Sequence, residues 1–253
     1  MSQRVLVTAG GSGIGRAIAE TFLRAGDRVH VCDIDGSMLQ ELSSDFPEAS
    51  VSVTDVGESG QVDAMFAAVE YRMGGLDVLI NNAGIGGQRA LIEDIDLDQW
   101  QQSLQVNLTG PFLTMRRAIP AMKAQSSGCI INIVTTSAIT GLPNRTCYVA
   151  SKCGLRGLTQ NAARELGPFN IRVNGVFPGA IDNERGRGII AKFAAEKDLS
   201  IDEATEKFLS FVSMRTLIEP QEIADMCAFL ASPAARHVSG QEICVDGNVE
   251  WEE

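Results

Sequence analysis

Thr8-Ala9-Gly10-Gly11-Ser12-Gly13-Ile14-Gly15 is a glycine-rich stretch that follows the apolar run Val5–Thr8 and opens the amphipathic stretch Gly13–Ala25. Glycines allow a tight turn and a close approach of backbone to ligand, and the first turn of the following helix offers free N–H groups to a pyrophosphate. The order of strand, turn and helix therefore predicts a dinucleotide-binding unit. An ordinary strand–turn–helix is the alternative, since a lone match of this kind is weak.

An acidic residue at the right distance favours the first interpretation. Asp33 ends the second apolar run, eighteen residues after Gly15. Its carboxylate can accept hydrogen bonds from both hydroxyls of an adenosine ribose, whereas a 2′-phosphate would be repelled by Asp33 and by the nearby Asp35. We therefore expect NAD as the cofactor rather than NADP. Arg16 is the one dissenting feature, and simple solvation in the first helical turn would explain it.

The remaining sequence alternates apolar runs with amphipathic stretches, which is typical of a parallel sheet covered by helices on both faces. We expect one domain, residues 1–253, with a doubly wound, Rossmann-type α/β sheet of about seven strands. The expected strands are Val5–Thr8, Arg28–Cys32, Val51–Thr54, Val78–Asn81, Cys129–Val134, Arg172–Phe177 and Glu242–Val245. The expected helices are Gly13–Ala25, Met38–Asp45, Gly60–Arg72, Asp98–Ala124 (kinked at Gly110-Pro111), Cys147–Leu166 and Glu222–Ala231.

Residues 183–216 break this alternation with two short helical patterns, the second opened by a capping box, Ser200-Ile201-Asp202-Glu203. An insertion beyond the carboxyl end of a strand belongs beside the ligand crevice of an open α/β sheet. We therefore expect a substrate lid. A surface helical hairpin without a gating role is the alternative.

A second motif, Tyr148-Val149-Ala150-Ser151-Lys152, carries the candidate chemistry. Side chains four residues apart lie on one face of a helix, so this tyrosine and lysine can act on one small volume. The ammonium favours the phenolate electrostatically, which suits the tyrosine to proton exchange. The spacing alone is common. Behind a dinucleotide turn it indicates hydride transfer.

Composition excludes several other classes. The net charge is −11, and the thirteen acidic and four basic residues from Glu196 to Glu253 contribute most of it, which argues against a nucleic-acid or membrane partner. The six cysteines form no Cys-x-x-Cys pair and there are two histidines, so we expect no metal site and reduced thiols. The start of the chain leaves no room for a signal peptide and no apolar run reaches spanning length, so we expect a cytoplasmic protein.

With these motifs, the chain resembles the short-chain dehydrogenase/reductase family over essentially its whole length. Three further matches are Asn81-Asn82-Ala83-Gly84 after the fourth expected strand, Pro178-Gly179 after the sixth, and Asn107. Ala9 replaces the first glycine of the family motif. The resemblance implies an NAD-dependent oxidoreductase with a small-molecule substrate. It also implies a homotetramer in which the expected helices Asp98–Ala124 and Cys147–Leu166 pair across one axis and the segment containing Trp251 packs near another.

The resemblance assigns roles to individual residues. Tyr148 would exchange the proton, Lys152 would hold the nicotinamide ribose, and Asn107 would position water in a proton relay. Asp55 would meet the adenine and Asn183 the nicotinamide carboxamide. The cofactor-binding set is Gly10, Ser12, Gly13, Ile14, Gly15, Asp33, Asp55, Val56, Asn82, Ala83, Gly84, Tyr148, Lys152, Pro178, Gly179, Ile181 and Asn183.

One catalytic position departs from the family pattern. The family's serine lies thirteen residues before the tyrosine, and here that residue is Thr135. Threonine keeps the hydroxyl, although its methyl group restricts rotation and narrows the pocket. We expect Thr135 to bind the substrate oxygen, with Ser137 as the alternative. If Thr135 and Thr136 only cap the strand, the enzyme would be slow or inactive.

Arginines suggest the substrate. Arg145 lies three residues before Tyr148, where some relatives that oxidise small hydroxy acids hold a carboxylate, and Arg185, Arg187 and Arg89 flank the same crevice. We expect a hydroxy acid or sugar acid, although each arginine alone could be a solvated loop residue. The alternatives are a neutral polyol, steroid or 3-oxoacyl substrate, a non-catalytic cofactor sensor, and a dehalogenase-like lyase.

Overall fold

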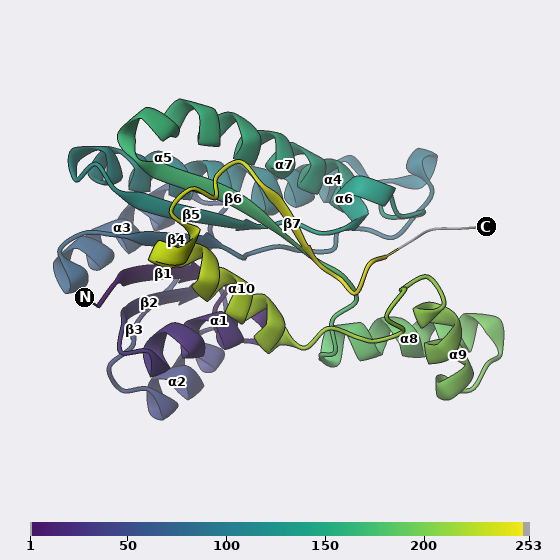
Figure 1. The fold of residues 1–253 in the computed structure, drawn as a ribbon. Helices are drawn as coiled ribbons and strands as arrows, with labels where there is room; N and C mark the ends of the chain where they lie inside the picture. Colours follow the sequence, from purple (N-terminus) through teal and green to yellow (C-terminus); the bar gives the residue numbers. More distant parts are fainter. Residues whose placement is uncertain (1, 250–253) are drawn as a thin grey trace.

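Seven parallel strands form one sheet with the order β3-β2-β1-β4-β5-β6-β7 in the computed structural model, which describes residues 2–249 (Figure 1). The order reverses between β1 and β4, and ligands of such sheets bind beyond the carboxyl ends of the strands at that point. The predicted doubly wound sheet is confirmed. The strands are β1 Arg4–Thr8, β2 Arg28–Asp33, β3 Ser50–Val53, β4 Val78–Asn81, β5 Gly128–Ile133, β6 Ile171–Pro178 and β7 Glu242–Val245.

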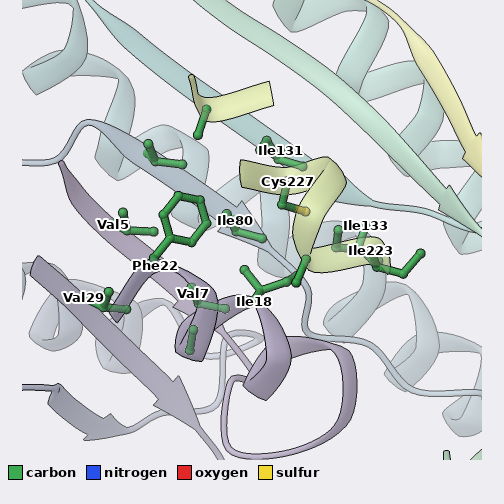
Figure 2. Close-up of a cluster of buried hydrophobic side chains, with 14 of the residues drawn as sticks. Val5, Val7, Ile18, Phe22, Val29, Ile80, Ile131, Ile133, Ile223 and Cys227 are labelled. Atoms are coloured by element: carbon green, nitrogen blue, oxygen red, sulfur yellow. The ribbon is translucent and has the colours of Figure 1, made fainter. Parts of the chain in front are cut away.

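Side chains of each central strand alternate between two apolar cores because successive residues face opposite sides of a sheet. Val5 and Val7 enter one core, and Leu6 enters the other. The first core lies under α1 (Gly13–Arg24), α2 (Gly36–Asp45) and α10 (Pro220–Ala231), and Figure 2 shows part of it. The second lies under α3 (Ser59–Met73), α5 (Gly110–Ala124) and α7 (Thr146–Leu166). The two cores fill the faces of the sheet, and the carboxyl ends of the strands are where a ligand would bind.

The expected helix Asp98–Ala124 is interrupted, but not at the predicted place. The structure has α4 (Leu97–Leu104), a π-helical turn (Gln105–Thr109), and then α5. Pro111 lies in the first turn of α5, where a missing N–H is tolerated, so the prolyl ring does not break that helix. The backbone widens in the turn before it. Such turns are frequent at functional sites, and this one contains Asn107.

The insertion after β6 forms α8 (Glu184–Lys197) and α9 (Ile201–Leu209), which Figure 1 shows beside the main body. The predicted capping box is confirmed: the Ser200 hydroxyl accepts from the Glu203 N–H at 3.2 Å, and the Glu203 carboxylate accepts from the Ser200 N–H at 2.9 Å. The two helices share a separate apolar cluster made of Ile190, Phe193, Ala194, Leu199, Ala204, Phe208 and Leu217. The insertion is therefore a small packed unit.

The residues after β7 pair with the chain as it returns from α9. The N–H groups of Ser213 and Met214 donate to the carbonyl oxygens of Asn248 and Gly247, at 2.9 and 3.1 Å. Val212 forms an antiparallel bridge with Val249. Trp251, expected at an oligomer contact, lies outside the described residues. Between residues 2 and 249, no helix is long and apolar enough to cross a membrane.

Candidate active site

The glycine-rich turn between β1 and α1 requires its small residues. A Cβ atom added to Gly15 would lie 2.1 Å from the carbonyl oxygen of Ala9, and Gly13 has φ +53°. Ala9 itself has φ +50°, so alanine occupies a left-handed conformation where the family motif has glycine. For a residue with a Cβ atom this conformation costs about 1–2 kcal/mol. Ser12 and Ile14 flank Gly13 at the start of α1, where the free N–H groups could receive a pyrophosphate.

The loop after β4 is fastened to this turn. The side-chain amide of Asn82 donates to the carbonyl oxygens of Thr8 and Ala9, at 3.1 and 3.0 Å. The Thr8 hydroxyl accepts from the N–H groups of Asn82 and Ala83, both at 3.0 Å. Two of the predicted motifs therefore form one rigid edge of the site.

Asp33 is held in place by the same turn. It is buried, and its two carboxylate oxygens accept from the N–H groups of Gly11 and Asp35, at 3.0 and 3.1 Å. A carboxylate offers about four acceptor positions, so capacity remains for two ribose hydroxyls. Arg16 is ion-paired with Glu20 at 2.7 Å and also with Asp45. The glycine cradle and this carboxylate fit an adenine dinucleotide.

The candidate catalytic pair, Tyr148 and Lys152, lies on α7. Tyr148 is half-buried, whereas Lys152 is buried and donates from Nζ to the carbonyl oxygen of Ile133, at the end of β5, at 2.8 Å. A Cβ atom added to Gly84 would lie 3.3 Å from Nζ of Lys152 and 3.2 Å from Oδ1 of Asn107. Because Gly84 has no side chain, the backbone of the loop after β4 can approach both Lys152 and Asn107 closely.

Asn107 is fully buried and ties that loop to α7. Its Oδ1 accepts from the N–H of Ile85 at 2.8 Å, and its Nδ2 donates to the Ile85 carbonyl and to the Ser151 hydroxyl, both at 2.9 Å. The Ser151 hydroxyl donates in turn to the Tyr148 carbonyl at 2.8 Å. Both donors of the Asn107 amide are used, and Oδ1 keeps one acceptor position.

The two candidate hydroxyls lie at the start of α6 (Ser137–Thr140), just after β5. Thr135 is buried and its hydroxyl accepts from the Ser137 N–H at 3.3 Å; Ser137 is half-buried. Thr136 donates its N–H to the carbonyl of Pro178 at 3.2 Å. The structure thus brings both candidates to the same strand end, two and four residues beyond the carbonyl that holds Lys152.

The other expected cofactor residues border the same edge of the sheet. Gly179 donates its N–H to the Val245 carbonyl at 3.1 Å, Ile181 forms a bridge with Ile218, and Asn183 caps α8 by accepting from the Gly186 N–H at 2.8 Å. Asn183 also faces the glycine turn, since its Nδ2 is 3.7 Å from a Cβ atom added to Gly13. After β3, the Asp55 carboxylate accepts from Gly57 N–H at 2.8 Å, and Val56 packs against Gly110.

Two of the four arginines, Arg89 and Arg187, are ion-paired with acidic side chains. Arg89 pairs with Glu196 at 3.3 Å, and Arg187 pairs with Asp182 at 3.0 Å. Arg145 lies beside the candidate catalytic tyrosine, with its guanidinium carbon 5.7 Å from the centre of the Tyr148 ring. The side chain of Arg185, on α8, lies outside the described part of the structure. Within that part, no three histidine, cysteine, aspartate or glutamate side chains are grouped so that they could hold a metal ion.

Comparison with known proteins identifies the family, because a family model described as enoyl-(acyl carrier protein) reductase matches residues 8–249. The chain belongs to the short-chain dehydrogenase/reductase family. Trans-4-hydroxycyclohexanecarboxylate dehydrogenase of Sinomonas cyclohexanicum is 35% identical to this chain. The alignment covers 96% of this chain and 90% of the dehydrogenase. Two similar solved structures are an actinorhodin polyketide ketoreductase variant with NADPH (TM-score 0.91, 32% identity, 97% and 96% of the two chains) and NAD⁺-bound xylitol dehydrogenase (0.90, 27%, 96% and 97%).

Membership of the short-chain dehydrogenase/reductase family makes the chain an oxidoreductase that acts on CH–OH groups with a nicotinamide cofactor. Its motifs account for most of the site, but sequence reasoning did not single out Thr8, Ile85, Ile133 or Ser151 as site residues. Ile85 and Ile133 act through backbone groups, which carry no signal in the sequence. Ser151 lies inside the Tyr148–Lys152 motif, where the helical spacing points to its neighbours.

Proposed function

We propose that this short-chain dehydrogenase/reductase interconverts a small secondary alcohol and its ketone with NAD, and that its substrate carries a carboxylate or similar anion. The observation that supports the reaction most directly is the buried Lys152, fixed on the Ile133 carbonyl one helical turn from Tyr148 and next to Gly84 of the loop after β4. This arrangement supports an acid–base pair at the carboxyl ends of the strands, where a nicotinamide would bind.

Each residue has a role in the proposed reaction. Tyr148 exchanges the proton of the substrate hydroxyl, and the ammonium of Lys152 favours its phenolate form. Thr135 donates a hydrogen bond to the substrate oxygen and orients the carbinol carbon. Asn107 fixes the loop after β4 and contributes its remaining acceptor position to a water relay from Lys152. Bound NAD supplies the hydride acceptor.

NAD rather than NADP is supported by the charge around Asp33. Its carboxylate faces the glycine turn from the end of β2, and Asp35 follows it. A 2′-phosphate would be repelled there. Arg16, the cation that would favour the phosphate, is ion-paired with Glu20 and Asp45.

The anionic substrate is supported by Arg145, whose guanidinium stacks over the ring of the proposed acid–base residue. A planar guanidinium binds a carboxylate with two parallel hydrogen bonds. The 35%-identical relative is named for a hydroxycyclohexanecarboxylate, a molecule that combines a hydroxyl with a carboxylate. Residues 183–216 would close over such a substrate as a lid and exclude water.

The proposed assembly is a homotetramer, built on pairing of α4–α5 and α7 between subunits. Phe112 on α5 and Phe169 after α7 are 48% and 39% exposed, and large apolar side chains of this kind are more stable in an interface. Light scattering at micromolar concentration would give the mass of four chains. A monomer mass would refute the assembly without bearing on the reaction.

The test of the function pairs each of several hydroxy acids with its neutral amide and follows NADH absorbance. The wild type should prefer the acid, and Arg145→Ala should lose about tenfold or more in kcat/KM on the acid alone, because a hydrogen bond to a charged group is worth about 1.5–3 kcal/mol. Equal activity on acid and amide, unchanged by the substitution, would contradict the anionic substrate. No NADH formation with any alcohol would contradict the reaction.

A further inference from the structure

Arg89 and Glu196 join two segments that lie 107 residues apart in the chain. Nη2 of Arg89 lies 3.3 Å from Oε2 of Glu196. Arg89 belongs to the loop after β4, the same loop whose Gly84 and Ile85 meet Lys152 and Asn107. Glu196 lies in the last turn of α8. The ion pair therefore connects the loop after β4, here called the catalytic loop, to the last turn of α8, the first helix of the insertion.

The insertion has a small apolar core of its own. Its apolar cluster draws its members from residues 190–217, so α8 and α9 pack on each other in a core of their own. Both ends of the insertion are anchored by backbone pairing, Ile181 with Ile218 at its base and Val212 with Val249 behind it. Small satellite cores of this kind open at lower free energy than the main core. Helices α8 and α9 can therefore open locally, and exchange their amide hydrogens, while the main body stays folded.

We propose that the Arg89–Glu196 pair is the latch that holds α8–α9 closed over the catalytic loop, and that it sets how often the site opens. This inference rests on the lid role in the proposed function. The pair crosses from the main body to the moving unit, whereas the Arg187–Asp182 pair stays at the base of α8 and does not cross.

The exposure of the pair suits a latch. The Arg89 and Glu196 side chains are 47% and 52% exposed. Ion pairs this exposed contribute little to stability and weaken with salt. A latch of this strength shifts an open–closed equilibrium by about two- to fivefold, so it biases the lid toward closure and still releases it in every turnover. A buried pair of charges would hold the lid shut.

The latch makes a prediction opposite to that of an anion clamp. If Arg89 binds the substrate anion, Glu196 competes with the substrate, so Glu196→Gln should lower KM while Arg89→Gln raises it. If the pair is a latch, both substitutions release the lid, so both should raise KM about two- to fivefold. The double exchange Arg89→Glu/Glu196→Arg should restore wild-type behaviour only for a latch.

The experiment measures hydrogen exchange of amides in residues 184–209 together with KM and kcat, at low and high salt. Asp63→Asn is the matched control, because it removes the Arg117–Asp63 pair, which has a similar length, 3.1 Å, and similar exposures, 47% and 55%, but lies between α5 and α3. Both single variants should exchange faster across 184–209, high salt should bring the wild type toward them, and the double exchange and the control should match the wild type.

Equal exchange rates in the wild type and both single variants would overturn the latch, and so would a fall in KM for Glu196→Gln. The exchange measurement needs no turnover. A protein that shows faster exchange in the variants but no activity would keep the latch and refute the proposed reaction. Activity with unchanged exchange would do the reverse.

Discussion

The side-chain amide of Asn107 binds both backbone groups of Ile85, at 2.8 Å to the N–H and 2.9 Å to the carbonyl. These two hydrogen bonds hold the loop after β4 against the π-helical turn. Moving the loop away would leave polar groups of Asn107 and Ile85 without partners. Asn107→Ala should cost about 1–3 kcal/mol for each group it leaves unsatisfied. Urea unfolding of the wild type and the variant measures this loss. A variant with unchanged stability would show that the loop finds other partners.

Tyr148→Phe should lower kcat by about 10²–10⁴-fold while NADH binding stays nearly unchanged, because the proton carrier is lost and the ring remains. The other tyrosine of the chain, Tyr71, is 85% exposed on α3, and Tyr71→Phe is the matched control. Turnover with an NAD-linked alcohol and fluorescence of bound NADH separate the two effects. Near-full turnover by Tyr148→Phe would show that Tyr148 is not the proton carrier.

Thr135→Val keeps the shape of the side chain and deletes its hydroxyl, so turnover should collapse while the fold survives. Thr135→Ser should stay active. Ser137→Ala should have the smaller effect, since the Ser137 N–H, which the substitution keeps, is the group that contacts Thr135. Steady-state kinetics of the three variants give the ranking. The reverse order would transfer the role to Ser137.

Asp33→Asn combined with Ile34→Arg should shift the preference toward NADP by about tenfold or more, because it removes a repelling charge and adds a partner for a phosphate. Asparagine keeps one oxygen that can accept from the Gly11 N–H and loses the acceptor of the Asp35 N–H, whereas Ile34 is 70% exposed, so its replacement removes no buried side chain. The ratio of kcat/KM values for the two cofactors measures the shift. A wild type that already prefers NADP would contradict the role given to Asp33.

His30 makes the stability of the fold depend on pH. It lies between the hydroxyls of Ser50 and Ser52, at 2.9 and 3.0 Å, and burial, with the positive charge of Arg72, lowers its pKa from 6.5 to about 4. The native state therefore favours the neutral ring. Its contribution, of the order of 3 kcal/mol, is complete above pH 6.5 and is lost as the pH falls toward 4.

Thermal unfolding between pH 7 and pH 4 tests this dependence. His30→Gln keeps a donor and an acceptor but does not titrate, so its stability should fall less over the window. Parallel curves for wild type and variant would show that other groups cause the loss.

The sequence was sufficient for the strands, because Val5–Thr8, Val78–Asn81 and similar apolar runs suit only positions buried on both faces of a sheet. Helix α2 begins at Gly36, two residues before the expected Met38, since Asp35 accepts from the Ser37 N–H at 2.8 Å and caps it. The charge of Asp35 is visible in the sequence, whereas its role as a helix cap depends on the extended backbone that precedes α2.

The candidate site was predictable where a motif fixes both type and spacing, as for Asp33, Tyr148 and Lys152. It was not predictable where the partner is distant in the chain or is backbone. The charge of Arg89 is visible in the sequence and suggests a substrate contact, whereas its pairing with Glu196 depends on how α8 folds back. The carbonyl of Ile133 could belong to any residue, and only the fold brings it to Lys152.

The ladder between residues 247–249 and 212–214 bears on how the protein can be handled. A fusion partner at the C-terminus would be joined close to the residues whose backbone pairs with the arm returning from α9, so its motion would strain that pairing and reach the insertion. The first strand enters at the other end of the molecule, far from α8 and α9 (Figure 1). An affinity tag ahead of Ser2 would leave that arm untouched, and surface immobilisation through the same end would leave the insertion facing the solution.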